Sequence, residues 1–123
     1  MISAKPIRIL YVEDDEIAAS IGQHILKLFD NVSVSHSPTG YHALEAYQPD
    51  DFDLLIVDLG LPDISGIELV QMIKKQYSKC PPVIAITAHI DPNEGPIKQI
   101  SKVYAKPMTF DMAEEILSSI PQS

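Results

Sequence analysis

The sequence predicts a protein of the α/β class, with a five-stranded parallel sheet between two layers of helices. Short apolar runs rich in β-branched residues alternate along the chain with segments whose apolar residues recur at helical spacing. Such alternation is typical of a parallel sheet covered on both faces. A length of 123 residues and a hydrophobic content of 46% suit one domain of ordinary size with a well-filled core.

The first strand is expected at residues 7–12, a mostly apolar run that ends in an acidic stretch. Apolar residues at helical spacing then predict a helix to about Phe29. Asp14 or Asp15 can cap the start of this helix, where an acidic group also suits the helix dipole. Residues 32–36 alternate between apolar and polar, which favours a strand nearer the sheet edge.

Residues 37–40 are expected to open a short helix that stops before Pro49. The third strand is expected at residues 52–57, an apolar run buried on both faces. Ser65 or Gly66 begins the next helix, which has apolar residues along one side and lysines near its end.

The fourth strand is expected at residues 83–87. Residues 91–96 contain two prolines and a glycine and are poor helix material, so only residues 97–101 remain for a turn or two of a fourth helix. A short fifth strand follows at residues 103–105, and Thr109 is placed to cap a last amphipathic helix.

This order of elements predicts the topology of the sheet. A strand and a helix alternate five times, and crossovers between parallel strands are right-handed. For such a (βα)5 chain the flavodoxin-like, doubly wound order 2-1-3-4-5 is favoured, with the first and third strands side by side where these sheets bind ligands. We expect residues 1–123 to form this single domain, with a core at about 7–120.

The net charge and the composition argue against several classes of function. The formal net charge of −8 argues against direct contact with nucleic acid, although it equally serves solubility. Cys80 is the only cysteine, which excludes an intrachain disulfide and a thiolate zinc site and suits a reducing cytoplasm. No apolar run approaches the length of a membrane span, so no membrane contact is expected. The four histidines show no metal-binding spacing and are expected to be ordinary surface or loop residues: His24, His36, His42 and His89.

Polar residues follow or finish four of the predicted strands. Asp58 follows the third strand, and taken alone an aspartate there is more often a turn cap than a reactive group. Glu13 and Asp14 follow the first strand, Thr87 finishes the fourth and Lys106 follows the fifth. Each of these also has an ordinary structural role, but in a parallel sheet all five residues meet at the carboxyl edge.

The chemistry of this set suits a phosphoryl group. Three neighbouring carboxylates repel one another, and a hard divalent cation such as Mg2+ relieves the repulsion with oxygen ligands. The backbone carbonyl of Gly60 is a reasonable extra ligand. Lys106 offers a positive charge and Thr87 a hydroxyl donor, and phosphoryl transfer depends mainly on positioning and charge neutralisation.

The ordered set of motifs resembles the receiver domain of bacterial two-component response regulators. The resemblance covers nearly the whole chain. The residues after Thr87 and Lys106 resemble the receivers of hybrid histidine kinases more than those of transcription factors. The matching segments are residues 9–15, residues 55–62 with Gly66, residues 83–88, and Lys106-Pro107.

The resemblance implies that Asp58 accepts a phosphoryl group from a phosphohistidine, carried by a histidine kinase or a histidine phosphotransfer domain. Such a protein is a phosphoacceptor that switches a downstream protein target, not an enzyme acting on external substrates. The resemblance implies further roles: a Mg2+ site formed by Glu13, Asp14, Asp58 and the Gly60 carbonyl; phosphoryl binding and switching by Thr87, Ala88 and Lys106; and a cis bond at Lys106-Pro107.

The chain departs from the family at the fifth strand. Receivers usually carry an aromatic residue three positions before the lysine, and Val103 stands there, with Tyr104 one position later. Tyr104 is therefore a candidate switch aromatic only if the strand register is shifted, because adjacent strand residues point to opposite faces.

Two other functions compete with this prediction. A haloacid-dehalogenase-like phosphatase also forms an aspartyl phosphate beside Mg2+, but that family needs a second aspartate two residues after the first, where this chain has Gly60. A binding module that is never phosphorylated is the other alternative, and the intact set of acidic residues, threonine and lysine weighs against it.

Overall fold

The computed structural model describes residues 6–88, 90 and 97–120 of the chain. Its centre is one sheet of five parallel strands in the order β2-β1-β3-β4-β5, which confirms the predicted order. The strands are β1 (Ile7–Val12), β2 (Val32–Ser37), β3 (Leu54–Asp58), β4 (Val83–Thr87) and β5 (Lys102–Ala105).

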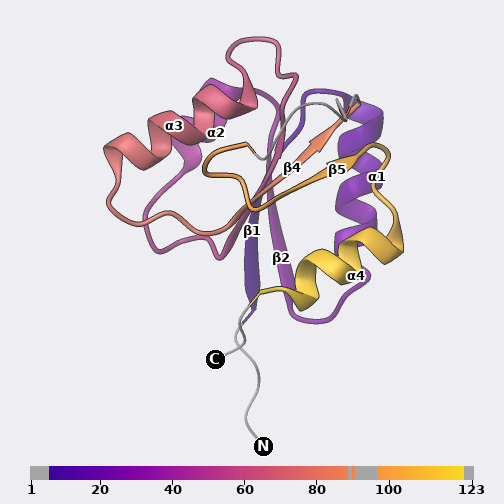
Figure 1. The fold of residues 1–123 in the computed structure, drawn as a ribbon. Coiled ribbons are helices and arrows are strands. Elements are labelled where there is room, and N and C mark those ends of the chain that lie inside the picture. The colour runs from indigo at the N-terminus through magenta and orange to yellow at the C-terminus, as the bar shows by residue number, and fades with distance from the viewer. Residues whose placement is uncertain (1–5, 89, 91–96, 121–123) are drawn as a thin grey trace, which may run out of the picture.

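Helices cover both faces of this sheet, with α1 and α4 on one face and α2 and α3 on the other (Figure 1). The helices are α1 (Glu16–Leu26), α2 (Gly40–Ala46), α3 (Gly66–Gln76) and α4 (Phe110–Ser118). Two apolar cores result, one on each face, because a strand sends alternate side chains to opposite sides. None of the helices in the described residues is long and apolar enough to cross a bilayer.

Each helix begins at a side chain that caps its first turn. Asp15 Oδ2 accepts a hydrogen bond from Ala18 N at 2.7 Å, and Thr109 Oγ1 accepts one from Met112 N at 3.1 Å, as the sequence predicts. Ser65 caps α3 in the same way. These caps fix where α1 and α4 leave the carboxyl edge of the sheet.

Two predicted boundaries were wrong. Helix α1 ends at Leu26 instead of Phe29, because the chain leaves the helix and turns through Asn31, which has a φ of 68°. The ring of Phe29 then stacks on the ring of Phe110, with centroids 4.7 Å apart. Strand β3 begins at Leu54 rather than at residue 52, and the side chain of Asp53 pairs with Arg8.

Between β4 and β5 the described residues contain no α-helix. Residues 97–101 form a turn between β4 and β5, in which Gln99 has a φ of 73° and Ile100 N bonds to the carbonyl of Ile97. Ser101 N already bonds to the carbonyl of Val83, so the chain enters the sheet at once. Residues 91–96 and His89 lie outside the described residues.

Candidate functional site

The sheet brings the predicted acidic residues together at its carboxyl edge. Val12 pairs with Val57 across β1 and β3, so Glu13 and Asp58 extend the same pair of neighbouring strands. Asp14 follows Glu13 and is exposed. One carboxylate oxygen from each of the three residues lies within 4.8 Å of the others.

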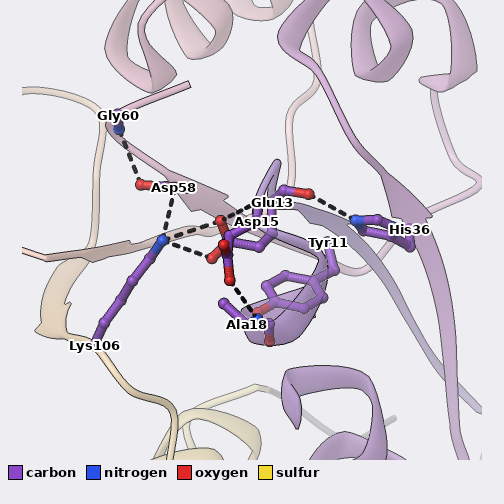
Figure 2. A network of polar contacts seen from close by, with 8 residues as sticks. All are labelled: Tyr11, Glu13, Asp15, Ala18, His36, Asp58, Gly60 and Lys106. Carbon is purple, nitrogen blue, oxygen red and sulfur yellow. Dashed lines mark hydrogen bonds and ion pairs between the residues drawn. The ribbon is translucent and has the colours of Figure 1, made fainter. Parts of the chain in front are cut away.

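Lys106 joins two of these carboxylates, as Figure 2 shows. Its Nζ lies 2.8 Å from Asp58 Oδ2 and 2.8 Å from Glu13 Oε1. The residues Glu13 and Asp58 are only 1% and 5% exposed, and the lysine side chain is 21% exposed. Because the cluster holds three carboxyl groups and Lys106 pairs with two of them, the site has negative charge to offer a cation.

The pKa values of the two buried carboxyl groups shift in opposite directions. Burial raises the pKa of Glu13 to about 7, although its hydrogen bond from Lys106 acts the other way. Burial also works to raise the pKa of Asp58, but hydrogen bonds from Lys106 and Gly60 N together lower it below its usual value. Asp58 is therefore the carboxylate that stays ionised.

Two glycines shape the loop after Asp58. Gly60 N donates to Asp58 Oδ1 at 2.9 Å, which orients the carboxylate and keeps Gly60 beside the site. A Cβ on Gly66 would lie 2.5 Å from the carbonyl oxygen of Asp58, so only glycine lets α3 start this close to the strand.

Glu13 is held from its other side by the edge strand. Glu13 N donates to the carbonyl of Ser37 at 3.0 Å, and His36 Nε2 donates to the carbonyl of Glu13 at 2.7 Å. His36 is thus not the ordinary surface residue that its spacing predicts. The alternating pattern of β2 was the available signal, since it turns His36 to the same side as the inward-facing valines.

The phosphate-binding candidates end the remaining two strands. Thr87 is the last residue of β4, and its carbonyl accepts a hydrogen bond from Lys106 N at 2.8 Å. Ala88 follows in an exposed bend. The peptide bond Lys106-Pro107 is cis, which confirms that prediction.

The sequence model of the protein family "response regulator receiver domain" matches residues 9–112 of this chain. The chain belongs to this family. The receiver domain is 32% identical over 107 residues to the aerobic respiration control sensor protein ArcB of Escherichia coli, a match that covers 84% of the chain but 14% of ArcB. The chain thus spans a small part of the curated relative that it matches.

Solved structures show the same fold. The receiver domain superposes with a TM-score of 0.84 on the CheY-like receiver domain from Methylobacillus flagellatus, at 26% identity, covering 95% of this chain and 100% of that one. A chain in the crystal structure of histidine kinase ThkA in complex with response regulator protein TrrA also matches, with a TM-score of 0.77 at 24% identity. The match covers 91% of this chain and 96% of that one. At that identity the second match shows the fold alone.

Tyr104 lies apart from the threonine in this receiver domain. In the strand register Tyr104 pairs with Ile86, whereas Thr87 pairs with Ala105, so the tyrosine and the threonine point to opposite faces of the sheet. Tyr104 packs against the core under α4, and its hydroxyl donates to Glu115 Oε1 at 3.0 Å. The register is not shifted, and this geometry gives no support to Tyr104 as the switch aromatic.

Proposed function

We propose that Asp58 is the phosphoacceptor of this receiver domain and takes a phosphoryl group from a phosphohistidine on a partner protein. The observation that carries the proposal is the ion pair between Lys106 Nζ and Asp58 Oδ2, beside the buried carboxyl group of Glu13 and the exposed one of Asp14. In the transfer an Asp58 oxygen forms a bond to phosphorus, the phosphorus–nitrogen bond breaks, and the electron pair returns to the imidazole.

Three carboxylates within reach of one another are a donor set that fits Mg2+. We propose that Glu13, Asp14, Asp58 and the Gly60 carbonyl hold this ion, which supplies charge neutralisation for phosphoryl transfer. Around it, Gly60 N orients the Asp58 carboxylate and Lys106 pairs with the phosphoryl oxygens.

Phosphorylation adds about 1.5 to 2 negative charges at this site. We propose that Lys106 and the Thr87 hydroxyl turn to this new charge, with Ala88 N–H as a further donor. Because the backbones of Thr87 and Lys106 are joined by a hydrogen bond, the ends of β4 and β5 respond together. This response shifts the equilibrium between two conformations of a protein-binding surface.

The partner is proposed to be a histidine kinase or a histidine phosphotransfer domain. Beside Glu13 and Lys106 opens a cavity of about 210 Å3 lined mainly by apolar side chains, with Ile17 at its rim and 72% exposed. An apolar rim next to the acceptor carboxylate suits a docking protein that must exclude water during transfer. A downstream protein target, a single domain over residues 1–123 and a cytoplasmic location stay predictions.

One experiment separates the competing functions. The protein is incubated with acetyl phosphate or phosphoramidate and Mg2+, and its intact mass is followed. We expect a gain of one phosphoryl group that is absent from Asp58→Asn. Turnover of many external phosphate esters would instead indicate a phosphatase, and no labelling, even by purified histidine kinases, would indicate a binding module.

A further inference from the structure

The loop that carries Gly60 is fastened to helix α2 by one side chain. Asp63 Oδ1 accepts a hydrogen bond from Gly40 N at 2.9 Å, and its Oδ2 accepts one from Tyr41 N at 2.8 Å. The two partners are more than twenty residues away in sequence, so this is a tertiary contact. Burial works to raise the pKa of Asp63, but the two N–H donors together lower it, as expected for a carboxylate held by donors.

The contact is close-packed as well as polar. A Cβ on Gly40 would lie 2.4 Å from Ile64 Cγ1 and 3.2 Å from Asp63 Oδ1, so the loop rests directly on the helix backbone. Ile64 and Leu61 are each 8% exposed and belong to the core under α2 and α3. Leu61 and Ile64 anchor the loop in the core, and Asp63 holds the loop against the start of α2.

The same end of α2 is connected to the other side of the cation site. The end of β2, which leads into α2 through residues 38 and 39, holds Glu13 through the Ser37 carbonyl and the His36 ring. A chain of contacts therefore runs from Asp58 through its loop to Asp63, across to α2, and back through Ser37 to Glu13. In this chain of contacts Asp63 makes the hydrogen bonds between the loop that carries Gly60 and α2.

We propose that Asp63 is a positioning residue for the Mg2+ site, acting through the loop that presents the Gly60 carbonyl. This inference rests on the proposed function, since it assumes that Gly60 and the acidic cluster hold the cation. Asp63 touches neither the cation nor the phosphoryl group. Asp63 restricts the distance between ligands on opposite sides of the site. Less conformational entropy is then lost when the cation binds.

The coupling must be reciprocal. If Asp63 favours Mg2+ binding through α2, then Mg2+ must strengthen the hydrogen bonds of Gly40 N and Tyr41 N to Asp63 by the same free energy. The amide signals of these two residues therefore report on an ion that they do not touch.

The test is a Mg2+ titration of the full chain labelled with 15N, at constant ionic strength and without any phosphoryl donor. For Asp63→Ala the half-saturating Mg2+ concentration should rise about fivefold, and the Gly40 and Tyr41 amide signals should stop responding. Asp63→Asn keeps one acceptor oxygen and should give an intermediate rise of about twofold.

The matched control is Thr39→Ala, which removes the other cap of α2. Thr39 Oγ1 accepts from His42 N at 3.0 Å and makes no bond to the loop, so this variant should bind Mg2+ as the wild type does. Unchanged half-saturation in both Asp63 variants, or an equal loss in Thr39→Ala, would overturn the proposal, as would a wild type that binds no Mg2+. If Asp63→Ala does not fold, Asp63→Asn decides. A protein that passes this titration but takes no phosphoryl group contradicts the proposed function alone.

Discussion

Burial and hydrogen bonding give two neighbouring carboxyl groups pKa values that shift in opposite directions. Lys106 lies 2.8 Å from both Glu13 and Asp58, yet Asp58 also accepts the Gly60 N–H, and its pKa falls while that of Glu13 rises to about 7. The proposed acceptor is thus ionised and ready to attack, and the neighbouring proposed Mg2+ ligand must lose a proton before it can bind the cation.

This difference predicts a pH-dependent affinity for Mg2+. Because Glu13 must be ionised to bind the cation, affinity should rise with pH, by up to about tenfold per pH unit, until pH 7 and then level off. Calorimetric Mg2+ titrations between pH 5.5 and 8.5 measure this rise. The variant Glu13→Gln should bind more weakly with a flat profile, and an equally flat wild-type profile would contradict the assignment.

At the residue scale, strand ends were predictable and long-range partners were not. Glu13, Asp14 and Asp58 could be placed together from the strand order alone, since parallel strands share one carboxyl edge. Asp63 and His36 could not, because their partners depend on how a loop and an edge strand pack. The alternation in β2 indicates the side to which His36 points but not its partner, and the spacing around Asp63 gives no signal at all.

At the scale of elements, the junction between β3 and α3 sets the position of Asp58. The carbonyl of Leu59 accepts the Gly66 N–H at 3.1 Å, so the loop closes on itself before the helix starts. Sequence patterns located this strand and helix but misplaced the start of β3 and the end of α1. Those ends depend on Asp53 pairing with Arg8 and on the left-handed Asn31 rather than on hydrophobic periodicity.

The junction predicts unequal effects of alanine on stability at its two glycines. In Gly66→Ala the new Cβ meets the Asp58 carbonyl, so the backbone must shift, and the free energy of unfolding should fall by about 1–3 kcal/mol. In Gly60→Ala the nearest atom to the Cβ, Asp58 Oδ1, is 3.7 Å away, an ordinary contact, and the change should stay within about 0.5 kcal/mol. Urea denaturation of both variants measures this, and equal stabilities would show that the close approach at Gly66 is not restrictive.

At the scale of the whole molecule, the predicted strand order holds although one expected helix is missing from the described residues. The order depends on alternating apolar segments distributed over the entire chain. It does not depend on a helix at residues 97–101, which form a turn before β5.

The acidic cluster predicts that Mg2+ stabilises the whole fold. A cation that binds only the folded state adds about 2.7 kcal/mol at a hundredfold excess over its dissociation constant, which raises Tm by several degrees. The rise should be larger at pH 8 than at pH 6, because Glu13 is then ionised. Thermal melts with MgCl2 measure this against NaCl of equal ionic strength, and Asp14→Ala should lose most of the effect. An equal response to both salts would exclude a specific site.

The central claim is that Asp58 becomes an acyl phosphate, and chemical mapping tests it most directly. The protein is labelled with phosphoramidate and Mg2+ and then reduced with borohydride. A first hydride adds at the acyl carbon and expels phosphate to leave an aldehyde, and a second hydride, with a proton from water, converts the aldehyde to the alcohol of homoserine. Peptide mass spectrometry then locates the homoserine. We predict it at position 58 alone. Homoserine at another acidic residue, or its formation in Asp58→Asn, would contradict the account.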